Sequence, residues 1–374
     1  MTAEGAKEFG ALEAQAATIM TLFAAKGYER VAPAFIQPAS LFLDRIGEKL
    51  RARTYIFSDP SGEELCLRPD LTLPVARVFL ERGAGDGVSK FSYNGPAFRI
   101  QTKPERLRTR EFRQAGIEYY GARGIEADLE VMALTLDAVR SCGVLDFTIR
   151  VGHISLVRAL LNALDMPQRW RDRLARAFRR QAFAQELDVL SRSQADRAPA
   201  LPETALTDDG FLAHLDTEGV PFIGLRRPAE IVKRLQHKAA DAQELPLSAE
   251  TVRLARDYLA TRGDVDAALD RIASLAAEAS LDLGPVMDDA RALLGGIKKL
   301  AGCAPVIFEA DFGRHFEYYT GMVFRIDAAG VERQIAGGGR YDGLIRALSG
   351  GARDVPAVGA AIHTERLLVA ASGR

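Results

Sequence analysis

Strand-like segments lie on both sides of a long helical block, and this order limits the folds open to the chain. Short alternating or β-branched stretches such as 54–57, 91–101 and 111–120 come before the block, and 306–309 and 321–326 follow it. The block is rich in Ala, Leu, Arg and Glu, and its apolar residues recur at helical spacing. We therefore predict an α+β fold, in which a mostly antiparallel sheet flanked by helices is interrupted by a helical insertion.

The change in character also gives the expected domain boundaries within the 374 residues. We assign residues 1–155 and 285–374 to the core that contains the sheet, and residues 156–284 to the insertion. Prolines between about 194 and 250 indicate that the insertion contains loops as well as helices. In the core, the apolar spacing predicts helices over 9–23, 72–82, 126–141 and 364–371.

Charge and cysteine usage exclude several classes of protein. Lys and Arg number 49 against 50 for Asp and Glu, which argues against a polybasic nucleic-acid binder. No apolar run approaches the roughly 18 residues of a membrane span, and the first ten residues lack the apolar region of a secretory signal. Cys66, Cys142 and Cys303 form no CxxC pair, so we expect neither a disulfide framework nor a metal site. These features predict a cytoplasmic protein without metal or cofactor.

Charged and amide side chains occur inside the strand-like segments, where alternating residues share one face. Gln114 and Glu118 share a face of one strand, with Gly116 leaving space between them, and Arg99 shares a face with Gln101. A carboxylate suits an ammonium group or a ring N–H, and an arginine suits a carboxylate or phosphate. The set could therefore form a pocket for a zwitterion such as an amino acid. The alternative is that this face of the sheet is simply solvated.

Five segments resemble, in the right order, the motifs of class II aminoacyl-tRNA synthetases, and specifically of histidyl-tRNA synthetase and its paralogues. They are 67–72, 98–118, 314–321, 338–342 and 359–366. The third and fourth are similar to two signatures specific for histidine, and Pro33 occupies the place of the proline of motif 1. The resemblance implies a class II synthetase-like fold and a homodimer formed through the motif 1 region.

The resemblance also implies a histidine-binding site, with the residues Asp70, Thr72, Gln114, Glu118, Arg314, Tyr318 and Tyr319. By position, the first three would hold the α-amino group, Glu118 and Tyr319 would read the imidazole ring, and Arg314 would face the carboxylate. A buried imidazole needs a partner at each ring nitrogen, and a carboxylate and a phenol can supply both. Arg99 and Arg366 would be vestiges of the arginines that grip ATP phosphates in a synthetase.

Departures from the family pattern favour a sensor over a synthetase. Gln101 replaces the glutamate of motif 2 and His363 replaces a glycine of motif 3, and both changes fall on the ATP side. Asp70 is one methylene shorter than the glutamate of the family. The chain stops about eight residues after motif 3, so we expect no anticodon-binding domain.

These departures and the kept histidine motifs imply a non-catalytic regulatory paralogue. Such a subunit would activate a short-form ATP phosphoribosyltransferase catalytic subunit and mediate histidine feedback inhibition in the first step of histidine biosynthesis. The helical insertion would then be a candidate contact surface for the catalytic subunit.

Two other functions remain open from the sequence. The arginines of the candidate site would also suit an enzyme that activates an amino acid with ATP. A basic stretch over 169–180 would suit RNA, but Trp170, Leu174 and Phe178 recur there at i, i+4 and i+8. This spacing predicts an ordinary amphipathic helix with the three side chains turned inward. We expect no nucleic-acid or membrane partner.

Overall fold

The computed structural model describes residues 5–43, 51–83, 87–101, 110–197, 202–222, 227–312 and 318–373. The chain forms two compact units. The first comprises Met1–Ala163, Phe178–Gln181 and Tyr258–Arg374, and the second comprises Leu164–Ala177 and Ala182–Asp257. The second unit lies within the predicted insertion 156–284, and the remaining residues of that range belong to the first unit.

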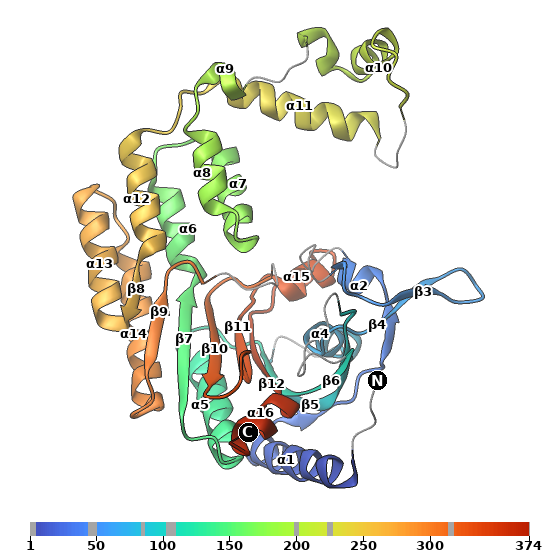
Figure 1. The fold of residues 1–374 in the computed structure, drawn as a ribbon, viewed down its shortest axis with the longest axis vertical. Helices are drawn as coiled ribbons and strands as arrows, with labels where there is room; N and C mark the ends of the chain where they lie inside the picture. The colour runs from blue at the N-terminus through green and yellow to red at the C-terminus, as the bar shows by residue number, and fades with distance from the viewer. Residues whose placement is uncertain are drawn as a thin grey trace. The chain divides into compact units, whose positions relative to one another are not determined.

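A nine-stranded sheet forms the centre of the first unit (Figure 1). Its strands in spatial order are β1 (Glu29–Arg30), β5 (Ser89–Phe98), β6 (Glu111–Tyr120), β12 (Ala357–His363), β11 (Ala336–Arg340), β10 (Met322–Ala328), β7 (Phe147–His153), β9 (Val306–Glu309) and β8 (Arg262–Asp264). Among these described strands, β1 with β5 and β7 with β9 are parallel pairs, and the other neighbours are antiparallel. The expected mostly antiparallel sheet is therefore corrected to a mixed sheet. A parallel pair needs a crossover connection, which helices supply between β7 and β9.

The register of this sheet brings the polar and small residues of several strands onto one face. Gln114, Gly116 and Glu118 alternate in β6, as predicted from the sequence. Glu118 lies opposite Gly359 of β12, and Gly359 lies opposite Gly339 of β11. Because directly opposite residues share a face, the carboxylate of Glu118 has no side chain beside it on the β12 side, whereas Phe91 of β5 lies opposite it on the other side.

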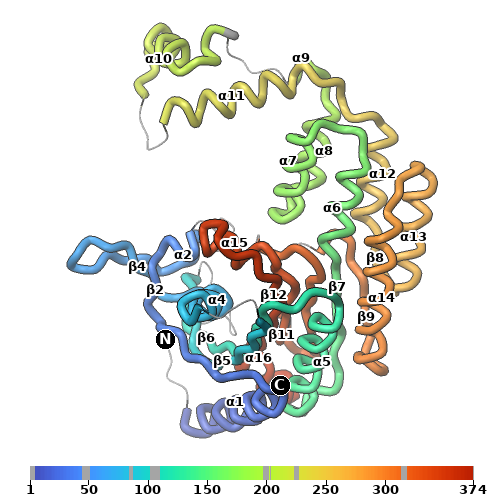
Figure 2. The backbone as a smooth tube through the Cα atoms, turned by 180° about the vertical axis from the view of Figure 1, so that it is seen from behind, coloured from blue at the N-terminus to red at the C-terminus, as the bar shows by residue number. Residues whose placement is uncertain are grey.

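Helices α1 (Ala6–Ala25) and α16 (Thr364–Ala371), at opposite ends of the chain, lie side by side (Figures 1 and 2). Gln15 Nε2 donates a buried hydrogen bond of 2.8 Å to the backbone oxygen of Thr364. Gly27, with φ of 80°, follows the end of α1. The predicted helix over 9–23 is confirmed, although Phe9 is 48% exposed and does not join the core.

A second, smaller sheet is formed by an early part of the chain. It contains β2 (Ile36–Pro38), β4 (Glu64–Leu67) and β3 (Ile56–Ser58), all antiparallel. The predicted hairpin is confirmed as β3–β4, whose turn is held by Asp59: its carboxylate accepts the N–H groups of Ser61 and Glu63 at 2.8 and 2.9 Å. Helix α4 (Thr72–Glu81) begins five residues after β4, and this junction carries Asp70 and Thr72.

The other helices of the first unit surround these sheets. They are α2 (Ser40–Leu43), α5 (Ile125–Ser141), α6 (Ile154–Ala163), α13 (Val265–Glu278), α14 (Gly284–Ala301) and α15 (Leu344–Leu348). Helix α14 packs against α5, α6 and α13. Among the described helices, none combines the length and apolar character needed to cross a membrane.

The second unit is helical. Its elements are α7 (Gln168–Arg179), α8 (Phe183–Leu190), α9 (Gln194–Arg197), the 3₁₀ helix η1 (Glu203–Leu206), α10 (Asp208–Thr217), α11 (Pro228–Gln243) and α12 (Ala249–Ala260). The last residues of α7 and of α12 belong to the first unit. Trp170 and Leu174 are buried, as predicted for this amphipathic helix. The Asp241 carboxylate accepts hydrogen bonds from Trp170 Nε1 at 2.6 Å and from Arg169 Nε at 2.8 Å. Part of the basic stretch is therefore engaged inside its own unit.

Candidate functional site

A cavity of about 900 Å³ opens on the small-residue face of the nine-stranded sheet, inside the first unit. Gly337 of β11 and Gly359 and Ala361 of β12 contribute to its lining. Because these residues are small, the sheet leaves a hollow there that larger side chains from neighbouring segments surround. Of the predicted site residues, those that line the cavity are Asp70, Thr72, Arg99, Gln114, Tyr318, Tyr319 and Arg366.

Two hydrogen-bond acceptors among the residues that line the cavity lack donors. Asp70 and Gln114 are only 3% and 4% exposed. Asp70 Oδ1 accepts the N–H of Leu73 at 3.3 Å, but Asp70 Oδ2 and Gln114 Oε1 find no hydrogen-bond partner among the described residues. Buried acceptors are normally satisfied, and a ligand ammonium group has three N–H donors to offer such acceptors. These two side chains are therefore suited to an amino group.

Burial raises the pKa of the Asp70 carboxyl to about 6, although Arg99 favours its charged form. Near pH 7 the group is still ionised, and its negative charge would pair with a bound ammonium group.

Glu118 lies beneath the cavity and does not line it. Its carboxylate is fully buried and accepts hydrogen bonds from Tyr93 at 3.3 Å and from Tyr341. Thr72 also hydrogen-bonds to it. Burial nevertheless raises the pKa of Glu118 to about 8. Glu118 thus bonds to Tyr341, which lines the cavity, and its reading of the imidazole together with Tyr319 stays a prediction.

This buried carboxyl gives a pH prediction. Glu118 binds its proton more tightly in the folded protein, where its pKa is about 8, than in the unfolded chain, where it has the ordinary value of 4.5. Folding therefore takes up a proton between these pH values, and the free energy of unfolding should fall as the pH rises through this window. Asp70 acts in the same direction between 3.8 and about 6.

The measurement is urea denaturation at a series of pH values. Glu118→Gln should flatten the profile, because the amide does not titrate. The matched control is Glu64→Gln on β4, since the Glu64 side chain is exposed. A Glu118→Gln profile parallel to that of the parent protein would contradict the prediction.

Three tyrosine rings form an aromatic wall, defined as Tyr318, Tyr319 and Tyr341, and all three line the cavity. Their ring centroids are 5.0 Å apart for Tyr318 and Tyr319, 5.6 Å for Tyr318 and Tyr341, and 6.3 Å for Tyr319 and Tyr341. Sequence reasoning gave Tyr341 no role. The available signal was its place in the 338–342 segment, two residues after the glycine run 337–339.

The cavity is also rich in arginine. Arg99 and Arg366 line it, together with Arg53 and Arg333. Arg99 Nε donates to Pro69 O at 2.8 Å, next to Asp70 in the chain, and Arg366 donates to Gln334 O at 3.0 Å. Burial lowers the pKa of Arg99 to about 10, although Asp70 favours its charged form, so its guanidinium is still charged near neutral pH. These arginines are suited to an anionic group.

His363 of β12 lies opposite Gln114 of β6. It lines the cavity, and its ring centroid lies 5.7 Å from that of Phe112. Arg99 covers the Phe112 ring at 4.8 Å. Arg314, predicted to face the ligand carboxylate, and most of the loop within motif 2 lie outside the described residues.

Comparison with known proteins agrees with this architecture. A family model described as histidyl-tRNA synthetase matches residues 5–218 and 223–367. The ATP phosphoribosyltransferase regulatory subunit of Brucella anthropi is 37% identical over 89% of this chain and 90% of its own length. That of Mesorhizobium japonicum is 36% identical over 94% and 96%.

Solved structures resemble the chain in fold. A Bacillus halodurans protein, described as an ATP phosphoribosyltransferase regulatory subunit/histidyl-tRNA synthetase, gives a TM-score of 0.69 at 21% identity and covers 99% of this chain and 81% of its own. A histidine–tRNA ligase subunit from Alicyclobacillus acidocaldarius gives 0.58 at 22% identity, with coverage of 100% and 96%.

The matched family model, the mixed sheet and the segments around the cavity define the class: the chain belongs to the histidyl-tRNA synthetase family. Within that family it belongs with the ATP phosphoribosyltransferase regulatory subunits, to which it is similar over most of its length.

Proposed function

We propose that the protein is the regulatory subunit of an ATP phosphoribosyltransferase and that it binds histidine in the cavity of its first unit. The observation that carries the ligand assignment is the pair of unsatisfied acceptors, Asp70 Oδ2 and Gln114 Oε1, on residues that line the cavity together with the aromatic wall. The relatives named as regulatory subunits support the partner assignment.

The chemistry of the cavity suits each part of histidine. Asp70, Thr72 and Gln114 hold the α-ammonium group, and the negative charge of Asp70 pairs with its positive charge. The imidazole lies against the aromatic wall, where the hydroxyl of Tyr319 can donate to one ring nitrogen or accept from the other. Glu118 acts through Tyr341, since the hydrogen bond between them fixes the position of that phenol. We assign the carboxylate to Arg314, as the family resemblance implies, and to the arginines that line the cavity.

In this function the protein is non-catalytic. The side chain at His363 occupies space where the synthetases bring a glycine backbone close to the nucleotide, and here it lies against the Phe112 ring. Gln101 removes a carboxylate from the same side. Histidine then acts as a signal: it binds one state of the complex better than another, and a coupling of roughly 1–3 kcal/mol is enough for feedback inhibition.

The partner is a short-form catalytic subunit, and the helical second unit is the surface that we assign to it. We also propose a homodimer through the small sheet of β2, β4 and β3. Two exposed apolar side chains share one face of this sheet: Ile36 is 51% exposed and Phe57 39%. Apolar side chains exposed this close together are typical of a protein–protein interface.

The alternative is an enzyme that activates an amino acid with ATP. The specific observation in its favour is that Arg99 and Arg366 both line the cavity. It predicts histidine-dependent exchange of pyrophosphate into ATP by this protein alone, which a regulatory subunit should not catalyse.

The deciding experiment mixes the protein with a short-form ATP phosphoribosyltransferase catalytic subunit from the same genome. We expect the catalytic subunit to gain activity on mixing and histidine to suppress that gain. Light scattering on the same mixture measures the homodimer and the complex. Absence of activation, together with pyrophosphate exchange, would overturn the regulatory assignment in favour of the enzyme.

A further inference from the structure

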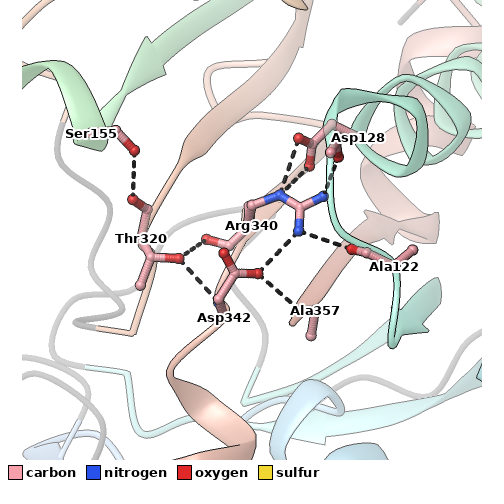
Figure 3. Close-up of polar contacts among 8 residues, drawn as sticks. Ala122, Asp128, Ser155, Thr320, Arg340, Asp342 and Ala357 are labelled. Carbon is pink, nitrogen blue, oxygen red and sulfur yellow. Dashed lines mark hydrogen bonds and ion pairs between the residues drawn. The ribbon is translucent and has the colours of Figure 1, made fainter. Parts of the chain in front are cut away.

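A buried guanidinium next to the aromatic wall has no part in the binding site described above. Arg340, at the end of β11, is only 8% exposed. Its Nε donates to both carboxylate oxygens of Asp128 at 3.0 and 3.1 Å. Its other nitrogens donate to Asp342 Oδ1 at 3.0 Å and to the backbone oxygens of Ala122 and Gly124 at 3.2 and 2.9 Å (Figure 3).

These bonds join segments that are far apart in the sequence. Asp128 lies in the first turn of α5, while Asp342 follows β11. Asp342 Oδ1 also accepts the N–H of Ala357 at 3.1 Å, which adds the first residue of β12. The guanidinium and the two carboxylates therefore fix the end of β11 against both α5 and β12.

The same cluster holds the segment that carries the other tyrosines. The N–H of Thr320 donates to the backbone oxygen of Arg340 at 2.8 Å, and the N–H of Asp342 donates to Thr320 Oγ1 at 3.0 Å. Ser155 Oγ, at the start of α6, donates to the Thr320 oxygen at 3.1 Å (Figure 3). Thr320 is thus held from two sides.

Each anchored residue is the chain neighbour of a ring in the aromatic wall. Tyr341 lies between Arg340 and Asp342, and Tyr319 directly precedes Thr320. The distance between the Tyr319 and Tyr341 rings, 6.3 Å between centroids, is therefore set by backbone bonds that converge on Arg340 and Asp342. Neither Arg340 nor Asp342 lines the cavity.

We propose that Arg340 is a positioning residue for ring recognition: through Asp128, Asp342 and Thr320 it holds Tyr341 and Tyr319 at the spacing that admits an imidazole. This inference rests on the proposed function. It explains why an arginine is needed, because a lysine has the charge but lacks the planar set of N–H groups that reaches acceptors of four residues at once.

A purely structural role for Arg340 makes a different prediction. A buried ion pair can contribute to stability without affecting ligand choice, and its loss would then lower the folded fraction while the remaining folded protein kept the parent selectivity. Selectivity between histidine and a ring-methylated histidine separates the two roles, because both ligands carry the same amino and carboxylate groups.

The experiment is calorimetric titration with L-histidine and with ring-methylated L-histidine, well below the melting temperature. The unsubstituted protein is titrated first. Arg340→Lys should weaken histidine binding about tenfold and should bring the affinities for the two ligands closer together. Thr320→Val removes the hydroxyl that accepts the N–H of Asp342 and contacts the Arg340 backbone oxygen at 3.5 Å. It should shift selectivity in the same direction, and it decides the question if Arg340→Lys does not fold.

The matched control is Arg169→Lys, which removes a comparable guanidinium cluster in the second unit. Arg169 bonds to Asp241 and Glu244 at 2.8 and 2.6 Å, far along the chain from the cavity residues. It should lower stability but leave both affinities unchanged. Parent selectivity in Arg340→Lys and Thr320→Val would overturn the inference. If the unsubstituted protein binds neither ligand, the proposed function itself fails and this inference falls with it.

Discussion

Asp70→Asn should weaken histidine binding roughly 100-fold, or about 2.7 kcal/mol. The substitution keeps the volume of the side chain and the Oδ1 acceptor for the N–H of Leu73. It removes the negative charge that attracts the ammonium group. It can also turn the unsatisfied Oδ2 position into an NH₂ donor that faces the N–H donors of the ligand. The neighbouring acceptor Gln114 Oε1 is unchanged, so some binding should remain.

Isothermal titration with L-histidine measures this change. The matched control is Asp311→Asn, because Asp311 lines the same cavity but its side chain is 49% exposed and has only a 3.5 Å contact with Arg262. We expect the control to change the affinity less than twofold. An Asp70→Asn variant within threefold of the parent would show that the amino group binds elsewhere.

The second large effect is steric. Gly359→Ala should lower the free energy of unfolding by about 3 kcal/mol and abolish measurable histidine binding. A methyl group at this position would collide with Glu118 Oε2 and lie 2.8 Å from the backbone oxygen of Ile117. Glu118 is fully buried and cannot turn away into solvent. The strand must shift, and Tyr341, which bonds to the same carboxylate, must shift with it.

A double substitution tests the cause. Glu118→Ala removes the group that the methyl meets, so Gly359→Ala should cost much less in the Glu118→Ala background than in the parent protein. Urea denaturation of the four proteins measures the coupling. The control is Gly343→Ala, where φ is −81° and no heavy atom among the described residues lies within 4 Å of the added Cβ. Equal costs for Gly359→Ala in both backgrounds would contradict the steric account.

Local patterns predicted much of the fold. The alternation around Gln114 and Glu118 gave strand β6 and the face that these residues share, because side-chain direction in a strand depends only on position. The apolar spacing between Leu12 and Phe23 gave α1 for a similar reason. The family segments added the class II synthetase-like fold and the cavity residues Asp70, Thr72 and Tyr319.

How deeply a side chain is buried could not be predicted from local sequence patterns. Alternation shows that Glu118 faces the cavity side of the sheet, but Tyr341, which covers it, comes from a segment 223 residues away in the chain. Tyr341 was overlooked for the same reason, since its importance lies in a contact that leaves no local pattern. The Arg340 cluster joins Asp128 and Asp342 over a similar span.

Boundaries and strand direction were also beyond local patterns. Helical periodicity continues through α13 and α14, so it could not show that these helices belong to the first unit while 182–257 belongs to the second. Strand β1 has two residues, Glu29 and Arg30, both exposed, and such a short strand carries no alternation from which a parallel partner could be inferred.

The strand order of the large sheet has a consequence for synthesis of the protein on the ribosome. Strands β10, β11 and β12, among the last described segments to be translated, insert between β6 and β7, which are made much earlier. Until they emerge, a nascent chain holds two apolar strands whose inner edges lack their final neighbours, and such edges are prone to pair with other chains. The intervening helices, rich in short-range contacts, can fold during this delay. We therefore expect truncated chains that end before residue 320 to aggregate or to bind chaperones, in contrast to the complete protein.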